Sequence, residues 1–182
     1  LKTGISSKED QQKYVDIAYT KAEQMKSLAN DLFEYTTLKS PSTKLNLNEL
    51  HIYSMLEQVA AGFELEAEKK GIDIEIEARP KNLTIQADAE KLVRVYNNLI
   101  SNAFKYGTGA TKIKLVANLV NKSEVELRVE NNGEPIPVSA QKKIFDRFYR
   151  VETSRNTKTG GTGLGLSITK SVVDSVSYTH LR

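Results

Sequence analysis

Largely hydrophobic positions recur every seven residues through the first part of the chain. Two interleaved series share this spacing: Tyr14, Lys21, Leu28 and Tyr35, and Ala18, Met25 and Leu32. Such series are typical of the contact seam of a coiled coil or helix bundle. The pattern predicts one long helix over Lys8–Leu38 whose hydrophobic stripe needs a partner helix. Packing of this stripe against the helix's own domain is the alternative.

After a break at Ser40-Pro41-Ser42, shorter patterns predict a mixture of helices and strands. Leu45 and Leu47 alternate with polar residues and indicate a short strand, and Asn48 is a candidate N-cap for the next helix. The further expected elements are a helix ending at Gly71, strands over 72–76 and 83–87, a helix from an Asp88 cap to Lys105, a hairpin of strands over 112–119 and 124–129, a short helix over 142–148 and a last helix after the glycines of 160–165. This mixture predicts an α+β fold, a two-layer α/β sandwich preceded by a long helix.

Composition narrows the function classes. The chain has 182 residues, of which 39% are hydrophobic and 27% are charged, so it is globular rather than disordered. It has no cysteine and two histidines, which excludes a disulfide scaffold, a thiolate nucleophile and a histidine cage for a metal. A net charge of +3 argues against a nucleic-acid partner. No apolar run approaches membrane-spanning length, and a start at Leu1 rather than Met favours a piece of a longer protein.

A polar face on the helix after Asp88 is the first candidate site. Asn98, Asn102 and Lys105 are spaced by four and three residues, which places them on one side of a helix. Asparagine is a mediocre helix former, so two of them in mid-helix need a reason. An amide oxygen suits Mg²⁺, and a lysine supplies a point charge for phosphate. A solvated polar face is the alternative.

Two glycine-containing segments add to this picture. At Val129–Pro137, a strand enters a turn in which Gly133 permits a close backbone approach to a ligand, and Asn131 can both donate to and accept from a base edge. A plain Asn-Asn-Gly turn is the alternative. At 160–165, glycines open a helix and expose backbone N–H groups to a phosphate. Their spacing fits neither a P-loop nor a dinucleotide fold.

Taken in order, these segments resemble the ATP-binding catalytic domain of sensor histidine kinases, in the superfamily shared with gyrase, Hsp90 and MutL. The resemblance covers about Thr43 to Asp174. It rests on four motifs: an N box at Asn98–Tyr106, a G1 box at Val129–Pro137, an F box at Ile144–Arg150 and a G2 box at Gly161–Leu166. The long first helix resembles the second helix of the family's dimerisation and phosphoacceptor hairpin. Asn131 in the G1 box and the run from Phe145 to Ile168 resemble the vancomycin-resistance type.

The resemblance implies a Bergerat-type ATP-binding fold with ATP and Mg²⁺ as cofactors. Asn102 would ligate Mg²⁺, and Asn131 would recognise the adenine amino group. Asn98, Lys105, Arg147 and Arg150 would act in catalysis at the phosphates. Tyr149–Thr159 would be the ATP lid. The whole implied nucleotide-binding set is Asn98, Asn102, Lys105, Tyr106, Asn131, Gly133, Ile136, Phe145, Arg147, Tyr149, Arg150, Gly161, Thr162, Gly163, Leu164, Gly165 and Leu166.

Several departures from the family pattern matter. Asn131 stands where the family has Asp, and Pro135 stands where a second glycine is usual, which stiffens the loop. The phosphoacceptor histidine segment is absent, and so are the family's two closing strands after Ser175. We therefore expect residues 1–42 to be the second hairpin helix with its linker, and residues 43–182 to be a C-terminally truncated catalytic domain.

The implied activity is transfer of the ATP γ-phosphoryl to a histidine on a dimerisation helix and then to a response regulator aspartate. The implied partners are a response regulator receiver domain and, in the full-length parent, a second copy through the hairpin. The chain would be the cytoplasmic portion of a membrane-anchored bacterial sensor, without a membrane contact of its own. An ATP-hydrolysing relative of the gyrase, Hsp90 or MutL kind is the first alternative, disfavoured because Asn98 occupies the position of the catalytic glutamate. A non-catalytic nucleotide-binding or interaction fragment is the second.

Overall fold

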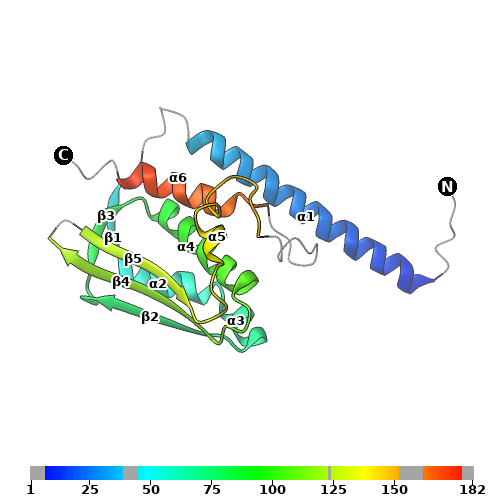
Figure 1. Ribbon diagram of the computed structural model, residues 1–182, viewed down its shortest axis with the longest axis horizontal. Coiled ribbons are helices and arrows are strands. Elements are labelled where there is room, and N and C mark those ends of the chain that lie inside the picture. The colour runs from blue at the N-terminus through cyan, green and yellow to red at the C-terminus, as the bar shows by residue number, and fades with distance from the viewer. Residues whose placement is uncertain (1–6, 39–44, 123, 152–161, 178–182) are drawn as a thin grey trace.

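A long helix projects from a two-layer body (Figure 1). The computed structural model describes residues 7–38, 45–122, 124–151 and 162–177. Helix α1 spans Lys8–Leu38, as predicted, and Ser7 caps it: the Asp10 N–H donates to the Ser7 hydroxyl over 3.0 Å. Most of the predicted stripe that the structure describes is exposed, with Met25 72% accessible. The C-terminal part of α1 contacts α6, so the body packs against the helix there but does not cover the rest of the stripe.

In the residues that the structure describes, the body contains two small sheets and the helices that cover them. Its elements are β1 (Asn48–His51), α2 (Ile52–Ala61), α3 (Glu64–Lys70), β2 (Asp73–Arg79), β3 (Thr84–Ala87), α4 (Ala89–Tyr106), β4 (Lys112–Asn121), β5 (Glu124–Asn131), α5 (Val138–Gln141) and α6 (Gly165–Ser177). One sheet has the order β2-β4-β5, with β2 parallel and β5 antiparallel to β4, and the other pairs β1 with β3. This arrangement confirms the predicted α+β sandwich with a preceding long helix.

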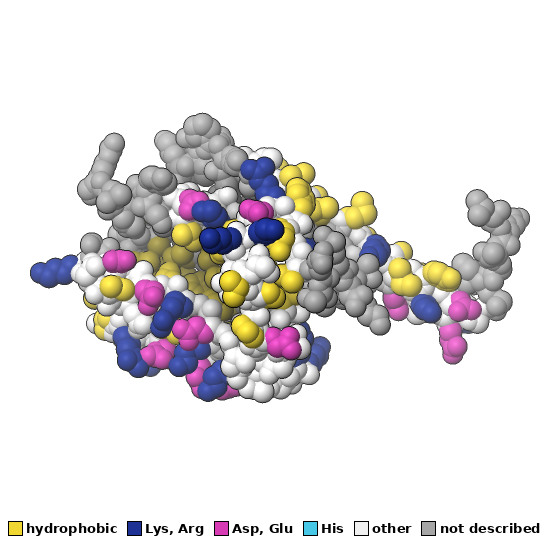
Figure 2. All heavy atoms as spheres, viewed as in Figure 1, with side chains coloured by type: hydrophobic (Ala, Val, Ile, Leu, Met, Phe, Trp, Pro, Cys, Tyr) yellow, Lys and Arg dark blue, Asp and Glu magenta, His cyan; other side chains and the backbone are white. Residues whose placement is uncertain are grey.

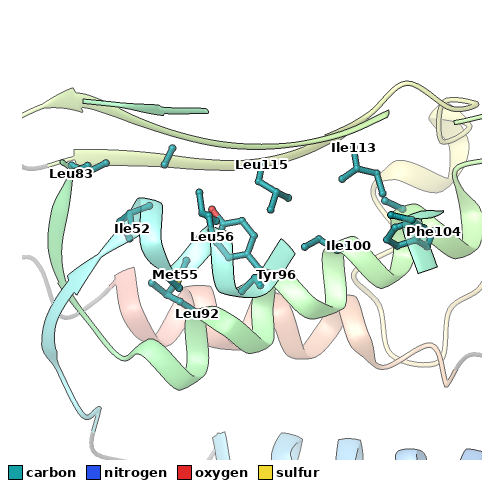
Figure 3. Packing of buried hydrophobic residues seen from close by; sticks show 14 of the residues in the cluster. Ile52, Met55, Leu56, Leu83, Leu92, Tyr96, Ile100, Phe104, Ile113 and Leu115 are labelled. Atoms are coloured by element: carbon teal, nitrogen blue, oxygen red, sulfur yellow. The ribbon is translucent and has the colours of Figure 1, made fainter. Parts of the chain in front are cut away.

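The main core lies between the three-stranded sheet and helices α2 and α4 (Figure 3). Ile113 and Leu115 point down from β4, and Leu56, Tyr96 and Ile100 meet them from the helices. These side chains are almost completely buried, so their removal from water is the main force that holds the layers together. Burial also raises the pKa of the Tyr96 phenol above its ordinary value.

The outer face of the sheet is charged and open to solvent. Glu75 and Glu77 on β2 pair with Lys112 and Lys114 on β4, and the hydrogen bond from Lys112 lowers the pKa of Glu75. Figure 2 shows positive and negative side chains interleaved over this part of the molecule. Exposed pairs of this kind contribute little to stability. The alternation explains why the strands read as half-buried in sequence.

Two predicted elements are displaced at the start of the body. Residues 45–47 are not a strand, and Asn48 begins β1 rather than capping a helix. Strand β1 pairs with β3, with Asn48 opposite Ala87. The backbone N–H and C=O groups of this segment are therefore satisfied by strand pairing and not by helix capping. The next helix starts at Ile52 and is interrupted at Gly62 and Phe63, so the single helix expected to end at Gly71 is α2 followed by α3.

The helix predicted over 142–148 is also shifted. Helix α5 occupies Val138–Gln141, directly after Pro137, and turns replace the expected helix after it. A proline cannot continue a helix from within but is well tolerated at its start, which favours the earlier position. The Asp88 cap, the hairpin of β4 and β5 and the last helix are confirmed. No helix within the described ranges has the length and hydropathy needed to cross a membrane.

Candidate functional site

Helix α4 packs against the main core on one side and against α6 on another, and it also carries the predicted polar face. Asp88 caps the helix by accepting from the Lys91 N–H over 3.2 Å, and it also accepts from the Asn46 N–H. Tyr96 and Ile100 face the main core, whereas Val95 packs in a second cluster with residues of α6. A narrow strip containing the predicted Asn98, Asn102 and Lys105 therefore stays available to a ligand.

The second cluster holds the start of α6 against α4. Leu164 is 1% exposed and packs with Val95, Ile168 and Val172. The Asn98 amide donates to the Gly165 carbonyl over 3.4 Å. A Cβ placed on Gly165 would lie 3.7 Å from the Asn98 Oδ1, so the two motifs are in ordinary contact there. The structure thus brings the N box and the G2 box together.

The F-box segment meets the same glycine segment. The Phe148 N–H donates to the Gly163 carbonyl over 3.0 Å. Gly163 has a φ of +72°, and a Cβ on it would lie 2.8 Å from the Phe148 backbone. Only glycine satisfies both requirements. The two segments on either side of residues 152–161 are therefore fastened to each other.

The G1 turn is attached to the C-terminal end of α4. A Cβ on Gly133 would lie 2.7 Å from the Gly107 carbonyl carbon, and one on Gly107 would lie 2.9 Å from the Asn131 Nδ2. The Glu134 N–H donates to the Thr108 carbonyl over 3.0 Å. The Asn131 side chain consequently lies against the end of α4, next to Gly107, which directly follows the predicted nucleotide contact Tyr106.

Among the described residues, Asn132 makes the side-chain hydrogen bonds that hold the turn. The Asn132 Oδ1 accepts from the N–H groups of Thr111 and Lys112, at 2.9 and 3.0 Å, and its Nδ2 donates to the Thr111 hydroxyl. Sequence reasoning missed this role, because neighbouring asparagines in a turn look equivalent. These contacts engage Asn132, and the role of Asn131 at a base edge stays a prediction.

The remaining predicted residues are placed less tightly. Ile136 and Phe145 are exposed, Arg147 is exposed, and Tyr149 and Arg150 are half-buried on the segment that bonds Gly163. Thr162 and Leu166 are half-buried next to the start of α6. Gly161 and residues 152–159 of the predicted lid lie outside the described residues. Their assigned roles stay predictions.

The residues present fit a magnesium ion that shares its ligands with phosphate. Within the described ranges no group of three acidic or histidine side chains could hold a metal by itself. The half-buried Asn102 offers a neutral amide oxygen on the α4 strip, and the neighbouring Asn98 uses its nitrogen toward Gly165. Hard oxygen ligands of this kind suit Mg²⁺, which usually keeps several waters and phosphate oxygens.

Asp31 of α1 is a further residue at this site that sequence reasoning missed. Its carboxylate accepts from the Arg94 Nη2 over 2.8 Å and from the Thr162 hydroxyl over 2.9 Å. Nothing in the sequence separates Asp31 from the solvated charges of α1, so no pattern could have found it. The contact ties the long helix to α4 and to the segment that begins α6.

Comparison with known proteins gives consistent results. The family model described as "Histidine kinase-, DNA gyrase B-, and HSP90-like ATPase" matches residues 87–180. Sensor protein VanSC of Enterococcus gallinarum is 34% identical over 161 residues, covering 88% of this chain and 44% of that protein. The chain thus spans less than half the length of this relative.

Solved structures of histidine kinases share the fold. Full-length ShkA in complex with AMPPNP superposes with a TM-score of 0.79 at 27% identity, covering 96% of this chain and 35% of that one. The histidine kinase ThkA in complex with the response regulator TrrA gives a TM-score of 0.66 at 25% identity, covering 83% of this chain and 45% of that one. With the four motifs assembled around α4 and the family model matching more than half of its residues, the chain belongs to the family of histidine kinase-, DNA gyrase B- and HSP90-like ATPases.

Proposed function

We propose that the chain is the catalytic ATP-binding part of a two-component sensor histidine kinase. It would transfer the γ-phosphoryl of Mg-ATP to a histidine on a dimerisation helix, from which a response regulator aspartate would take it. The observation that carries this proposal is the contact between the Asn98 amide and the Gly165 carbonyl. It joins a neutral polar helix face to a glycine-opened helix start, and both are suited to phosphate.

The chain's own residues would act by positioning and by charge. Gly107 and Gly133 let the G1 turn approach the end of α4, which supports placing adenine at Asn131 and Tyr106. The phosphates would then lie toward Asn98, with Lys105 and the F-box arginines as counter-charges. A bound Mg²⁺ at Asn102 would neutralise charge on the phosphate oxygens. Phosphoryl transfer needs little more than this from the protein, because the acceptor imidazole is the nucleophile.

Hydrolysis by water is disfavoured as the activity. The hydrolysing relatives would need a glutamate at the position of Asn98 to take a proton from water, and an amide cannot do so. The Asn98 nitrogen is also engaged with Gly165. A fragment that binds nucleotide without turnover is the remaining alternative, and the experiment below separates it from a kinase.

The exposed stripe of α1 supports a helical partner. Tyr14, Met25, Leu28 and Leu32 remain accessible, and Figure 2 shows hydrophobic side chains along the projecting helix. We infer that this stripe packs in a dimerisation hairpin in the full-length parent, which would be a membrane-anchored sensor with this part in the cytoplasm. The complex of ThkA with a response regulator supports a receiver domain as the second partner.

The test is phosphotransfer to a hairpin supplied separately. The chain is mixed with labelled Mg-ATP and a helical hairpin that carries the phosphoacceptor histidine from a sensor kinase of this type. We expect acid-labile label on the hairpin and none on the chain itself. Asn98→Ala should abolish transfer, whereas Asn97→Ala, on the exposed side of the same helix, should preserve it. Nucleotide binding without any transfer would favour the non-catalytic alternative, and label on His51 or His180 would contradict the domain assignment.

A further inference from the structure

The carboxylate of Asp31 occupies a position unlike that of the other acidic residues on α1. Asp31 is only 9% exposed, whereas Asp16 and Glu23 on the same helix are exposed. Its two oxygens are divided between two elements of the body. Oδ1 accepts from Arg94 on α4 at 2.8 Å, and Oδ2 accepts from the Thr162 hydroxyl at 2.9 Å. One side chain of the long helix thus contacts both α4 and the segment just before α6, the two elements that carry the candidate phosphate site.

Both partners of Asp31 are neighbours of residues expected to meet the phosphates. Arg94 precedes Asn98 by one helical turn on α4. Thr162 directly precedes Gly163, and its Oγ1 accepts from the Leu164 N–H over 3.2 Å, which helps to shape the start of α6. Movement of Thr162 would therefore alter the backbone of the glycine segment. Loss of the Asp31 carboxylate would in turn free the Thr162 hydroxyl.

The Thr162 hydroxyl has a single hydrogen to donate. In the structure that hydrogen is directed to Asp31, because the Thr162 oxygen is the donor in this contact. A phosphate oxygen arriving at the G2 segment is a competing anionic acceptor for the same hydrogen. The two negative groups would also repel each other at short range. Thr162 cannot serve Asp31 and a nucleotide phosphate at the same time.

We propose that Asp31 is a positioning residue that couples the docking of α1 to the occupancy of the nucleotide site through this competition. Nucleotide binding withdraws Thr162 from Asp31 and loosens α1, and docking of α1 weakens nucleotide binding by the same factor, because such coupling is reciprocal. The inference rests on the proposed function for its ligand. It adds a regulatory contact between the long helix and the site.

The geometry of α1 allows this contact to coexist with a partner helix. Asp31 precedes Leu32 of the exposed stripe by one residue, which is a rotation of about 100° around a helix. One side of α1 can therefore be held against the body while the series of Ala18, Met25 and Leu32 faces another helix. Release at Asp31 would change how that stripe, and any helix bound to it, is oriented toward the phosphates.

The test measures affinity and helix docking in the same variants. The probe is AMPPNP with Mg²⁺, and its affinity is measured by calorimetry for the wild type, Asp31→Ala and the control Asp16→Ala. Because the chain has no cysteine, spin labels at Lys26→Cys and Glu126→Cys, both exposed, report the distance between α1 and the sheet. Asp31→Asn is the conservative second variant if circular dichroism shows that Asp31→Ala is unfolded.

We expect Asp31→Ala to bind AMPPNP about fivefold more tightly, at the lower end of usual couplings between sites, and Asp16→Ala to match the wild type. Asp31→Asn should shift in the same direction by less. Saturating AMPPNP should broaden the distribution of distances between the two labels in the wild type. In Asp31→Ala this distribution should already be broad without nucleotide. Equal affinities for Asp31→Ala and Asp16→Ala would overturn the coupling and leave the proposed function intact. Failure of every variant to bind AMPPNP would overturn the proposed function and the coupling with it.

Discussion

The amide nitrogen of Asn131 lies so close to Gly107 that a Cβ on this glycine would come within 2.9 Å of it. The same Cβ would lie 2.5 Å from the Ala103 carbonyl oxygen. The end of α4 and the G1 turn are therefore fitted to each other without room for a methyl group. This contact sets where a base-recognising side chain can stand relative to the polar strip of α4.

Gly107→Ala should destabilise the fold and weaken nucleotide binding. The φ of Gly107 is −77°, which suits alanine, so the penalty comes from the steric contacts alone. We expect a loss of about 1–3 kcal/mol in the free energy of unfolding, as for other overpacked sites, measured by urea denaturation. Gly62→Ala is the control, because its φ of −64° is helical and its closest contact is a milder 3.3 Å. Equal losses in both variants would contradict the fitted contact.

Asn131→Asp should strengthen adenine binding. A carboxylate that accepts from the adenine amino group makes a charge-assisted bond, and desolvation offsets part of it, so we expect a gain of about 1 kcal/mol. Selectivity for ATP over GTP should increase, because guanine presents a carbonyl oxygen at that position. Calorimetry with both nucleotides measures this. Asn132→Asp should leave the ratio unchanged, and weaker ATP binding with an unchanged ratio in Asn131→Asp would mean that Asn131 does not face the base.

Asn102→Ala should remove most of the Mg²⁺-dependent part of nucleotide affinity. The reason is that its amide oxygen would be a metal ligand, while the rest of the nucleotide contacts are spread over other motifs. Calorimetry in Mg²⁺ and in EDTA separates the two contributions. Asn97→Ala, whose side chain is exposed on the same helix, provides the comparison. An Asn102→Ala affinity that still responds to Mg²⁺ as the wild type does would remove Asn102 from the metal site.

Tyr96→Phe should stabilise the protein, most visibly at high pH. The Tyr96 hydroxyl is buried and has no hydrogen-bond partner among the described residues, so its removal should gain about 1 kcal/mol. Burial raises the pKa of Tyr96, which means that the unfolded chain loses this proton first. Below the pKa of about 10 in the unfolded chain, Tyr96 does not lower the free energy of unfolding through ionisation. As the pH rises above this pKa, ionisation of the unfolded chain lowers the free energy of unfolding.

Thermal unfolding between pH 8 and 11 tests this prediction. Tyr19→Phe is the control, because the Tyr19 side chain is 69% exposed on α1. The alkaline loss of stability should shrink in Tyr96→Phe and stay as it is in Tyr19→Phe. A destabilised Tyr96→Phe would show that the hydroxyl has a partner after all.

Sequence periodicity predicted the elements that rest on long or strongly capped patterns. The heptad pattern predicted the extent of α1, and the Asp88 cap predicted the start of α4, because both signals are local. The strand at Asn48 was misplaced because its pairing partner, Ala87, is distant in the chain and overrides the local cap preference. Short elements next to prolines were shifted for a related reason, since one turn of helix carries little periodic signal.

The site was predictable where motifs share a helix and unpredictable where contacts cross between elements. The position of Asn98 and Asn102 on one face of α4 follows from their spacing alone. The contact of Asn132 rather than Asn131 with Thr111 is set by the register of β4 and β5, which local sequence does not reveal. Asp31 has no sequence signal, because its burial arises only when α1 lies against α4 and α6.

The position of α4 between two hydrophobic clusters has a consequence for the size of the ligand. Its polar strip runs from Asn98, beside Gly165, to Lys105, two residues before Gly107, and covers about 10 Å along the helix axis. With the base at the Asn131 end, nucleoside mono-, di- and triphosphates would differ in how far their phosphates extend along this strip toward Asn98. The strip would therefore select nucleotides by the length of the phosphate chain.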